Sequence, residues 1–432
     1  YKRQLLHGSV TKQQRRKRRI MKKKVVSLLA AMALAVTALA GCGSNNAATT
    51  GTDAATVAAT TEAAATTEAA ATTEADGEAV SGVKAGFIFL HDENSTYDLN
   101  FLNGAKAACE KLGIEYMTKT NIPEGQEAYE AACELADAGC NFIFADSFGH
   151  EDYIIEAAKE YPNVQFSHAT GTKAHTEGLD NFHNAFASIY DGRYLAGIVA
   201  GMKLNEMIAN GDITEDQAKM GYVGAYTYAE VMSGYTSFFL GARSVCPSVT
   251  MDVTFTGSWY DETAEKEAAN KLIEGGCVLI SQHADTTGAP SACETAGVPC
   301  VGYNVDMTSV APDAALTSPT NNWGVYYTYA VQCVLDGKAI DTDWCKGFSE
   351  DAVRITPVNE AVAAEGTDAK VEEVEAALKD GSLHVFDTST FTVNGSSLED
   401  LIAEGGDYAK YADYVSDGYY HESELASAPS FD

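Results

Sequence analysis

The segment EAACELADAGC at residues 130–140 is followed directly by the apolar run NFIFADS at 141–147. A second segment, EAANKLIEGGC at 267–277, is followed by VLISQHAD at 278–285, and the two eleven-residue segments share six residues at an offset of 137. Each pattern is typical of an amphipathic helix that ends at glycine and leads into a buried strand. The matching order predicts a duplicated unit with one copy in each of two lobes.

Short apolar runs alternate with helical patterns on both sides of these segments. Strands are predicted at 84–90, 142–145, 164–168 and 220–225, and helices at 101–112 and near 194–207. Such alternation is typical of an α/β fold in which each lobe is a doubly wound, mostly parallel sheet. With 432 residues, 46% of them hydrophobic, the chain is long enough for two or three compact units.

The amino-terminal part is predicted to lie outside these layers. Residues 1–20 precede the first methionine and are interpreted as extra upstream sequence, whereas 21–41 combine a Lys-rich start with an apolar run, the layout of a secretory signal. The motif LAGC at 39–42 resembles a bacterial lipobox, which predicts that Cys42 is lipidated and anchors the exported protein to the outer face of the bacterial cell membrane. The alternative is an ordinary signal peptide with a chance cysteine. Residues 42–82, rich in Ala and Thr, are predicted to form a flexible tether.

The charge is distributed unevenly. Residues 1–41 hold eleven of the 29 Lys and Arg residues and no acidic residue, which leaves the remainder with 18 basic against 61 acidic residues and a formal net charge of −43. Phosphate backbones would repel so acidic a surface, so nucleic acid is excluded as a partner.

Catalytic and metal-binding patterns are missing from the sequence. After Cys42, nine cysteines remain without a CxxC pair, and they are predicted to be buried thiols. The histidines are scattered, and His283 and Asp285 have no nucleophile motif near them. The sequence therefore predicts no enzyme, no cofactor and no metal.

Aromatic and carboxylate residues gather in the loops that follow predicted strands. In open α/β sheets, ligands bind beyond the carboxyl ends of the strands. An aromatic ring beside a carboxylate or amide suits a flat heterocycle, which needs stacking on its face and hydrogen bonds at its edge. The alternative is that these aromatics only fill gaps between lobes. The candidate residues are Tyr97, Asp98, Ser147, Phe148, Asp152, Trp259, Asp261, Gln282, His283, Asp285, Asn304 and Trp323.

Several segments, in order along the chain, resemble the basic membrane protein (BMP) family. They are NSTYDLNFLNGAKAA at 94–108, FADSFGHEDYIIEAAKEYPNVQFSHATG at 144–171, SIYDGRYLAGIVAGMK at 188–203 and GSWYDETAEKEAANKLIEGG at 257–276. QHADTTGAP at 282–290 and TNNWGVYYTYAVQCVLDG at 320–337 resemble a subgroup of that family for which a purine base such as adenine is the implied ligand. The family comprises lipoprotein substrate-binding components of ABC importers, which implies a two-lobed, type I periplasmic-binding-protein fold and an ABC permease as partner.

The resemblance also implies roles for individual residues. Tyr97 stands where the family has the ring that stacks on the base, and Asp98 replaces an asparagine beside it. The first-lobe pocket loop is matched by Ser147, Phe148 and Asp152, and the second-lobe segments by Trp259, Asp261, Gln282, His283 and Asp285. Either Trp259 or Trp323 is predicted to close on the ring from the side opposite Tyr97.

Two departures from the family pattern bear on the ligand. Asn304 stands where nucleoside binders carry an aspartate, and Asn321 stands where they carry a lysine. Loss of these charged partners for ribose hydroxyls favours a free nucleobase or another small polar ring.

These inferences predict a binding protein that closes around its ligand by a hinge motion and then docks on a permease. The first lobe is expected to contain 84–205 and about 317–345, and the second 219–316 and part of 346–432. Three alternatives belong to other classes: a signalling receptor of the same fold, a sugar-binding lipoprotein, and a hydrolase of similar layers, which the missing nucleophile motif disfavours.

Overall fold

The computed structural model describes residues 82–425 and residue 430. The predictions for residues 1–20, the signal sequence, Cys42 and the tether up to residue 81 lie outside the described residues. Within 82–425, no helix has both the length and the apolar character needed to cross a membrane.

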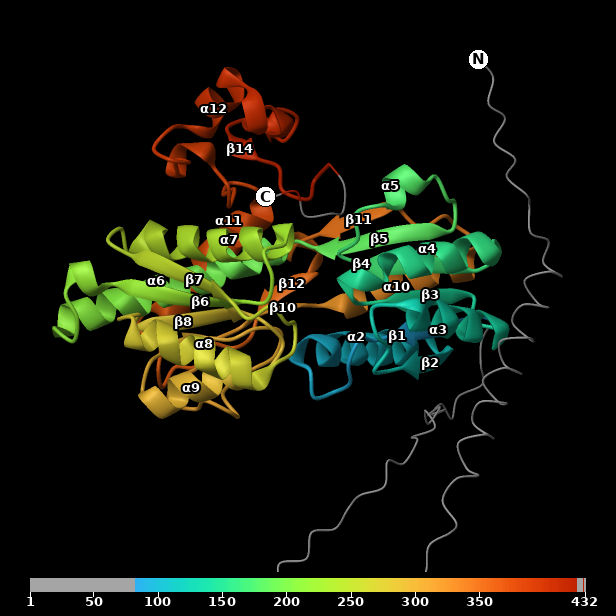
Figure 1. Cartoon of the computed structure of the whole chain (residues 1–432), viewed down its shortest axis with the longest axis horizontal. Coiled ribbons are helices and arrows are strands. Elements are labelled where there is room, and N and C mark those ends of the chain that lie inside the picture. Colours follow the sequence, from blue (N-terminus) through green and yellow to red (C-terminus); the bar gives the residue numbers. More distant parts are fainter. Residues whose placement is uncertain (1–81, 426–429, 431–432) are drawn as a thin grey trace, which may run out of the picture. The chain divides into compact units, whose positions relative to one another are not determined.

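The first lobe is built on a six-stranded sheet with the order β11-β5-β4-β3-β1-β2, in which every neighbouring pair is parallel. Helices lie on both sides of this sheet, as Figure 1 shows. The strands are β1 (Lys84–Ile88), β2 (Glu115–Lys119), β3 (Phe142–Ala145), β4 (Gln165–Ala169), β5 (Phe182–Ala187) and β11 (Asp343–Lys346). The helices are α2 (Thr96–Leu112), α3 (Gln126–Asp137), α4 (Glu151–Glu160), α5 (Ala174–Glu177) and α10 (Trp323–Asp336).

The second lobe is built on a four-stranded parallel sheet with the order β7-β6-β8-β9. Its strands are β6 (Lys219–Gly224), β7 (Thr250–Phe255), β8 (Leu279–His283) and β9 (Cys300–Val301). Its helices are α7 (Ala229–Val245), α8 (Glu262–Glu274) and α9 (Gly288–Ala296). The helix α6 (Ile189–Asn210), most of which was predicted to belong to the first lobe, packs against α7. The predicted doubly wound α/β layers with mostly parallel sheets are therefore confirmed.

The two repeated segments occupy equivalent places in the two sheets. The first leads into β3, beside β1, and the second leads into β8, beside β6. Both helices end in the same way: Gly139 and Gly276 each have a φ of 89°, and the following Cys140 and Cys277 N–H groups each donate to a leucine carbonyl five residues back. A positive φ of this kind favours glycine, so the shared glycine of the sequence motif has the same conformational role in both lobes.

Two antiparallel strands, β10 (Pro319–Asn321) and β12 (Val353–Ile355), form a separate pair between the sheets. In Figure 1 they lie between the two layered regions, and the chain between them supplies α10 and β11 to the first lobe. Chain crossings of this kind allow two lobes to rotate relative to each other.

The remaining carboxyl-terminal part is a small region of short elements. They are α11 (Thr367–Asp380), α12 (Leu398–Glu404), β13 (Val415–Ser416) and β14 (Tyr419–Tyr420). This region is joined to α6 by a hydrogen bond from the Tyr190 hydroxyl to the Glu422 carbonyl, at 2.8 Å.

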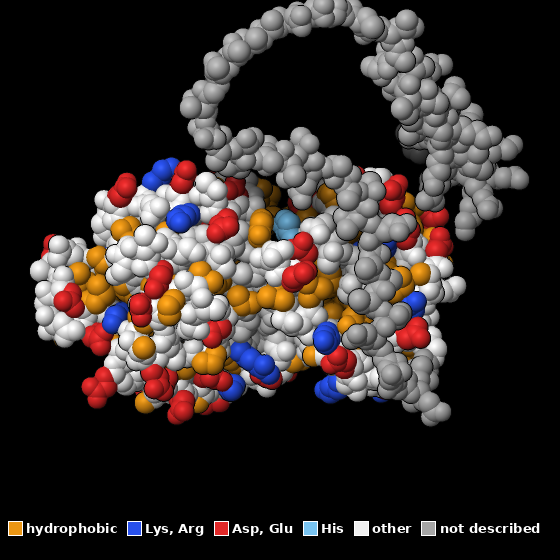
Figure 2. Space-filling view, turned by 90° about the horizontal axis from the view of Figure 1, so that it is seen from below, with side chains coloured by type: hydrophobic (Ala, Val, Ile, Leu, Met, Phe, Trp, Pro, Cys, Tyr) orange, Lys and Arg blue, Asp and Glu red, His pale blue; other side chains and the backbone are white. Residues whose placement is uncertain are grey.

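One apolar core cluster contains residues of α6 and α7 together with residues of both sheets. The two helices pack backbone against backbone, because a Cβ atom at Gly197 would lie 2.1 Å from the Phe238 carbonyl oxygen, and one at Gly241 would lie 2.1 Å from that of Tyr194. The cysteines of the described residues are free thiols, and all but Cys345 are buried, as the sequence predicted. In the space-filling view of Figure 2, acidic side chains are spread over the visible face among fewer basic ones.

Candidate functional site

The loop after β1 is fixed by a cap at the start of α2. The Ser95 hydroxyl accepts from the Asp98 N–H at 3.2 Å and donates to the Asp98 carboxylate at 2.6 Å, as serine commonly does at a helix start. This cap places Tyr97 in the first turn of α2. The Tyr97 hydroxyl donates to the Asp146 carbonyl at 2.9 Å, and its ring lies 4.7 Å from that of Phe101. Both the hydroxyl and the ring of Tyr97 are therefore fixed by contacts within the first lobe.

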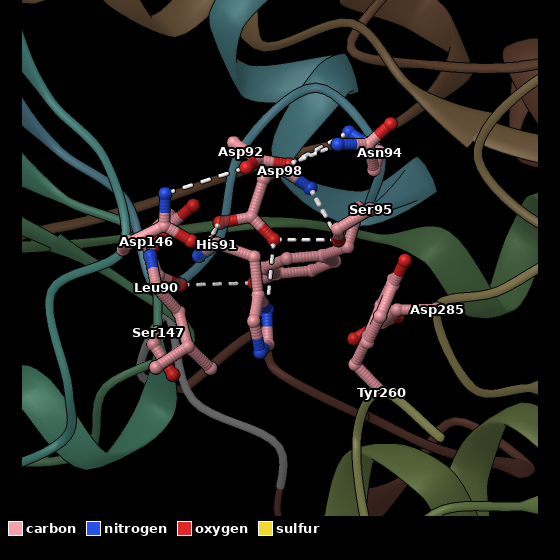
Figure 3. A network of polar contacts seen from close by, with 12 residues as sticks. Leu90, His91, Asp92, Asn94, Ser95, Asp98, Asp146, Ser147, Tyr260 and Asp285 are labelled. Carbon is pink, nitrogen blue, oxygen red and sulfur yellow. Dashed lines mark hydrogen bonds and ion pairs between the residues drawn. The ribbon is translucent and has the colours of Figure 1, made fainter. Parts of the chain in front are cut away.

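Two carboxyl groups beside this loop, those of Asp98 and Asp146, are buried; both are labelled in Figure 3. Burial and the neighbouring Asp98 raise the pKa of Asp146 well above its ordinary value. Burial also acts to raise the pKa of Asp98, but hydrogen bonds from His91 and Ser95 outweigh it and hold that pKa below its ordinary value. The two carboxyl groups therefore differ in character: their surroundings favour the ionised form of Asp98 and the protonated form of Asp146.

The loop after β3 supplies the next part of the first-lobe wall. The Ser147 hydroxyl and the Gly149 N–H both donate to the Glu124 carboxylate, at 2.6 and 2.9 Å, and the Ser147 carbonyl contacts His168 Nε2 at 2.6 Å. Phe148 is left 39% exposed, and its ring lies 5.3 Å from that of Tyr228 in the second lobe. The two lobes therefore meet through aromatic rings at the mouth of the cleft.

In the second lobe, hydrogen bonds from two buried side chains, Gln282 and Arg193, fix the turn after β8. The Gln282 amide donates to the carbonyls of Ala284 and Thr286 at 3.1 and 2.9 Å, and Arg193 donates to the Gln282 carbonyl at 2.6 Å. These bonds present Asp285, whose N–H donates to the Trp259 carbonyl at 2.9 Å. Burial raises the pKa of Asp285 well above its ordinary value, which favours the protonated carboxyl.

His283 is a neutral, buried ring on β8. Burial, assisted by the positive charge of Arg193, lowers its pKa to about 4. Its Nε2 atom lies 3.6 Å from the Glu230 carboxylate, and its ring lies 4.9 Å from that of Tyr303. Arg193 is itself fully buried, with its guanidinium 3.9 Å from the centre of the Tyr303 ring, so a cation–π contact supports this wall from behind.

These side chains converge on one small cavity, here called the cleft pocket. It encloses about 20 Å³, room for about one water molecule, so the lobes are closed in this structure. A second space of about 100 Å³, here called the outer cavity, shares Phe148, Thr170, Glu230 and Trp259 with it. The cleft pocket is lined by Leu90, Tyr97, Ser147, Phe148 and Thr170 of the first lobe and by Glu230, Trp259, His283, Asp285 and Tyr303 of the second.

Six of the candidate residues are brought together in the cleft pocket. They are Tyr97, Ser147, Phe148, Trp259, His283 and Asp285. Two more support it without lining it: Asp98 completes the α2 cap, and Gln282 shapes the turn that presents Asp285.

The other candidates lie elsewhere. Asp152 is on the surface and forms an ion pair with Lys173, and Asp261 caps α8 by accepting from the Ala264 N–H at 2.9 Å. Asn304 is buried in a left-handed conformation, with a φ of 65°, and its side-chain amide has no hydrogen-bond partner within the described residues.

Trp323 departs most clearly from its predicted position. It begins α10 and stacks on Phe101 of α2 at 4.5 Å between ring centres, with the backbone of Gly104 directly against it. It is 2% exposed and belongs to the core of the first lobe, the lobe that also holds Tyr97. The structure therefore does not place Trp323 opposite Tyr97; Trp259 is the tryptophan that lines the cleft pocket from the second lobe.

The sequence did not single out Glu230. This residue lies in the first turn of α7, one turn beyond the aromatic loop at 226–228. A carboxylate just inside a helix that follows a strand is common in sequences, because acidic residues favour helix starts, so position alone gave no signal.

Comparisons with known proteins agree on the family. Residues 89–383 match the family model Bmp, described as "ABC transporter substrate-binding protein PnrA-like". The chain is 34% identical to a purine-binding protein of Brucella abortus (strain 2308) over 309 residues, 70% of this chain and 83% of that protein. It is 32% identical to a putative ABC transporter glucose-binding protein of Haloferax volcanii over 226 residues, 52% of this chain and 53% of that protein.

A solved structure supports the fold. An ABC transporter solute-binding protein from Aeropyrum pernix K1 superposes with a TM-score of 0.60 at 18% identity, covering 74% of this chain and 96% of that one. The predicted two-lobed, type I periplasmic-binding-protein fold is confirmed.

Proposed function

Because this chain belongs to the Bmp family of PnrA-like ABC transporter substrate-binding proteins, we propose that it binds a purine nucleobase or nucleoside between its lobes and delivers it to a permease. The family consists of solute-binding proteins, so a small-molecule ligand and an ABC permease are its partners. The purine is suggested by the name of the Brucella relative, with which this chain shares 34% identity over most of its length.

The observation that carries the proposal is the composition of the cleft pocket. Aromatic side chains line it from both lobes, Tyr97 from the first and Trp259 and Tyr303 from the second, together with the carboxyl groups of Glu230 and Asp285. A flat ring between aromatic faces gains stacking and burial, while carboxyl groups at its edge fix its orientation. No Lys or Arg is among the lining residues described above, so an anionic ligand is disfavoured.

The closed state implies how binding couples to motion. A purine is far larger than the space for one water molecule, so the lobes must separate for it to enter the cleft pocket. Residues of both lobes would then contact the ligand, and these contacts favour the closed state. The permease would bind the closed form.

Attachment to the outer face of the cell membrane through a lipid on Cys42 is part of the same proposal. It rests on the LAGC motif at 39–42 and the apolar run before it. Two or more acyl chains give stable anchoring where a single chain is marginal.

A sugar is the second candidate ligand, because the Haloferax relative is named as a putative glucose-binding protein. Mass spectrometry of small molecules released from protein purified under native conditions distinguishes the two. We expect a purine base or nucleoside in stoichiometric amount; a hexose in its place would reject the proposal.

A further inference from the structure

We propose that Glu230 accepts a hydrogen bond from an exocyclic amino group of the ligand and thereby makes the cleft selective for aminopurines. The inference rests on the proposed function, because it assigns a role at the same site. It adds a specificity-determining residue that the motifs of the sequence do not mark.

Glu230 lies where a ligand would enter the cleft. It lines both the cleft pocket and the outer cavity, which meet at this side chain together with Phe148, Thr170 and Trp259. Its side chain is only 13% exposed. A ligand that enters through the outer cavity passes this carboxylate before it reaches Tyr97.

The Glu230 carboxylate also lacks a close donor. Within the described residues, its polar contact is with His283 Nε2 at 3.6 Å, slightly beyond hydrogen-bond distance. This single long contact leaves most of the carboxylate's acceptor capacity unused, and its place in the first turn of α7 favours the negative charge. The arrangement therefore offers a strong acceptor to whatever fills the cleft.

The carboxyl group of Asp285 contrasts with that of Glu230. This carboxyl also lines the cleft pocket, and the residue is buried. Burial raises the pKa of Asp285 well above its ordinary value and so favours the protonated carboxyl, which can donate a hydrogen bond. A donor and an acceptor together match an aminopurine edge, which presents an amino group beside an unprotonated ring nitrogen. A sugar hydroxyl, which both donates and accepts, would not require this division.

His283 has a positioning role in this account. Its ring approaches Gly234 of α7 so closely that a Cβ atom there would lie 2.8 Å from His283 Nδ1. Glu230 and Gly234 are one turn apart on α7, so the imidazole packs against the turn that carries the carboxylate. The absence of a side chain at Gly234 therefore allows the His283–Glu230 contact.

The test uses pairs of ligands that differ at the amino group. Calorimetry would compare adenine with 6-methylpurine, and guanine with hypoxanthine, on the full chain. For at least one pair, we expect the amino-bearing member to bind about 10- to 100-fold more tightly, the range for one hydrogen bond to a charged group. Glu230→Gln, which keeps the shape and weakens the acceptor, should remove most of that preference.

Two further variants complete the design. Glu262→Gln changes an exposed carboxylate in the first turn of α8, and it should leave the preference unchanged. Glu230→Asp keeps the charge with a shorter reach and should retain part of the preference; it also serves if the glutamine variant does not fold.

Failure of the Glu230 role and failure of purine binding give different results. If purines bind but neither pair is discriminated, or if Glu230→Gln keeps the full preference, the role of Glu230 is rejected while the proposed function stands. If no purine binds, the proposed function fails and this inference fails with it.

Discussion

The Thr96 backbone N–H donates to the Asp285 carbonyl oxygen at 3.0 Å, and the Thr96 hydroxyl donates to the same oxygen at 3.1 Å. Thr96 begins α2 in the first lobe, whereas Asp285 follows β8 in the second. Both residues adjoin the cleft pocket, which Tyr97 and the Asp285 side chain line. These hydrogen bonds therefore join the lobes beside the proposed ligand position.

Thr96→Val should shift the lobes toward the open state. The change removes the hydroxyl donor but keeps the backbone donor, and one such hydrogen bond contributes about 0.5–1.5 kcal/mol. The ratio of closed to open molecules should fall about two- to tenfold. Small-angle scattering would show a larger radius of gyration without ligand, and saturating purine should restore the smaller value. The control is Thr176→Val, an exposed threonine of the first lobe; an equal effect there would remove the link to the Asp285 contact.

Tyr97→Ala should weaken purine binding by about 10- to 100-fold, because the stacking contact and the burial it provides are both lost. Tyr97→Phe keeps the ring and loses only the hydrogen bond to the Asp146 carbonyl, so its effect should be much smaller. Calorimetry measures both. Equal losses in the two variants would assign the effect to the hydroxyl rather than to the ring.

Glu265→Gln should change how stability depends on pH. Burial raises the pKa of Glu265 to about 7, even though the Thr286 hydroxyl donates to it at 2.7 Å. Between about pH 4.5 and 7, the folded protein keeps this proton while the unfolded chain loses it, so the free energy of unfolding falls as the pH rises through that window. Because glutamine does not titrate, the free energy of unfolding of the variant should lack this decrease.

The melting temperature of Glu265→Gln relative to the unchanged protein should therefore rise between pH 5 and pH 7, by on the order of 5 °C, and stay level above pH 8. Glu262→Gln on the same helix is the matched control, because Glu262 is exposed. A relative melting temperature that does not vary with pH would show that Glu265 is ionised in the folded protein.

Cys42→Ser should release the protein from the membrane or leave it unprocessed, because the modified thiol would be missing. Fractionation of cells into membrane and soluble fractions, with blotting for this chain, measures the outcome. Membrane retention equal to that of the unchanged protein would contradict lipid attachment at Cys42.

Much of the site could be predicted because parallel strands end at the same edge of a sheet. Ser147 and Phe148 follow β3, Trp259 follows β7, and Asp285 follows β8, so their loops converge without any knowledge of side-chain contacts. The duplicated helix–strand unit likewise depends on local patterns that both lobes repeat.

The candidate residues that lie outside the cleft pocket are placed by packing between segments that are distant in the sequence. Trp323 follows a strand as the others do, but α10 lies against α2. The missing side chain at Gly104 lets the backbone at the start of α10 approach α2, and the indole stacks on Phe101. Asp152 lies in a helix turn that faces solvent, so it pairs with Lys173 instead. Which face a helix turns toward the cleft is decided by such contacts, and a loop position alone does not contain that information.

The most direct test of the account is calorimetry of the ligand-free full chain with adenine, guanine, hypoxanthine, their nucleosides and glucose. The account predicts that at least one purine base binds. The family resemblance further predicts that this base binds more tightly than its nucleoside, because Asn304 and Asn321 stand where nucleoside binders carry charged residues. Binding of glucose with no binding of any purine would contradict it.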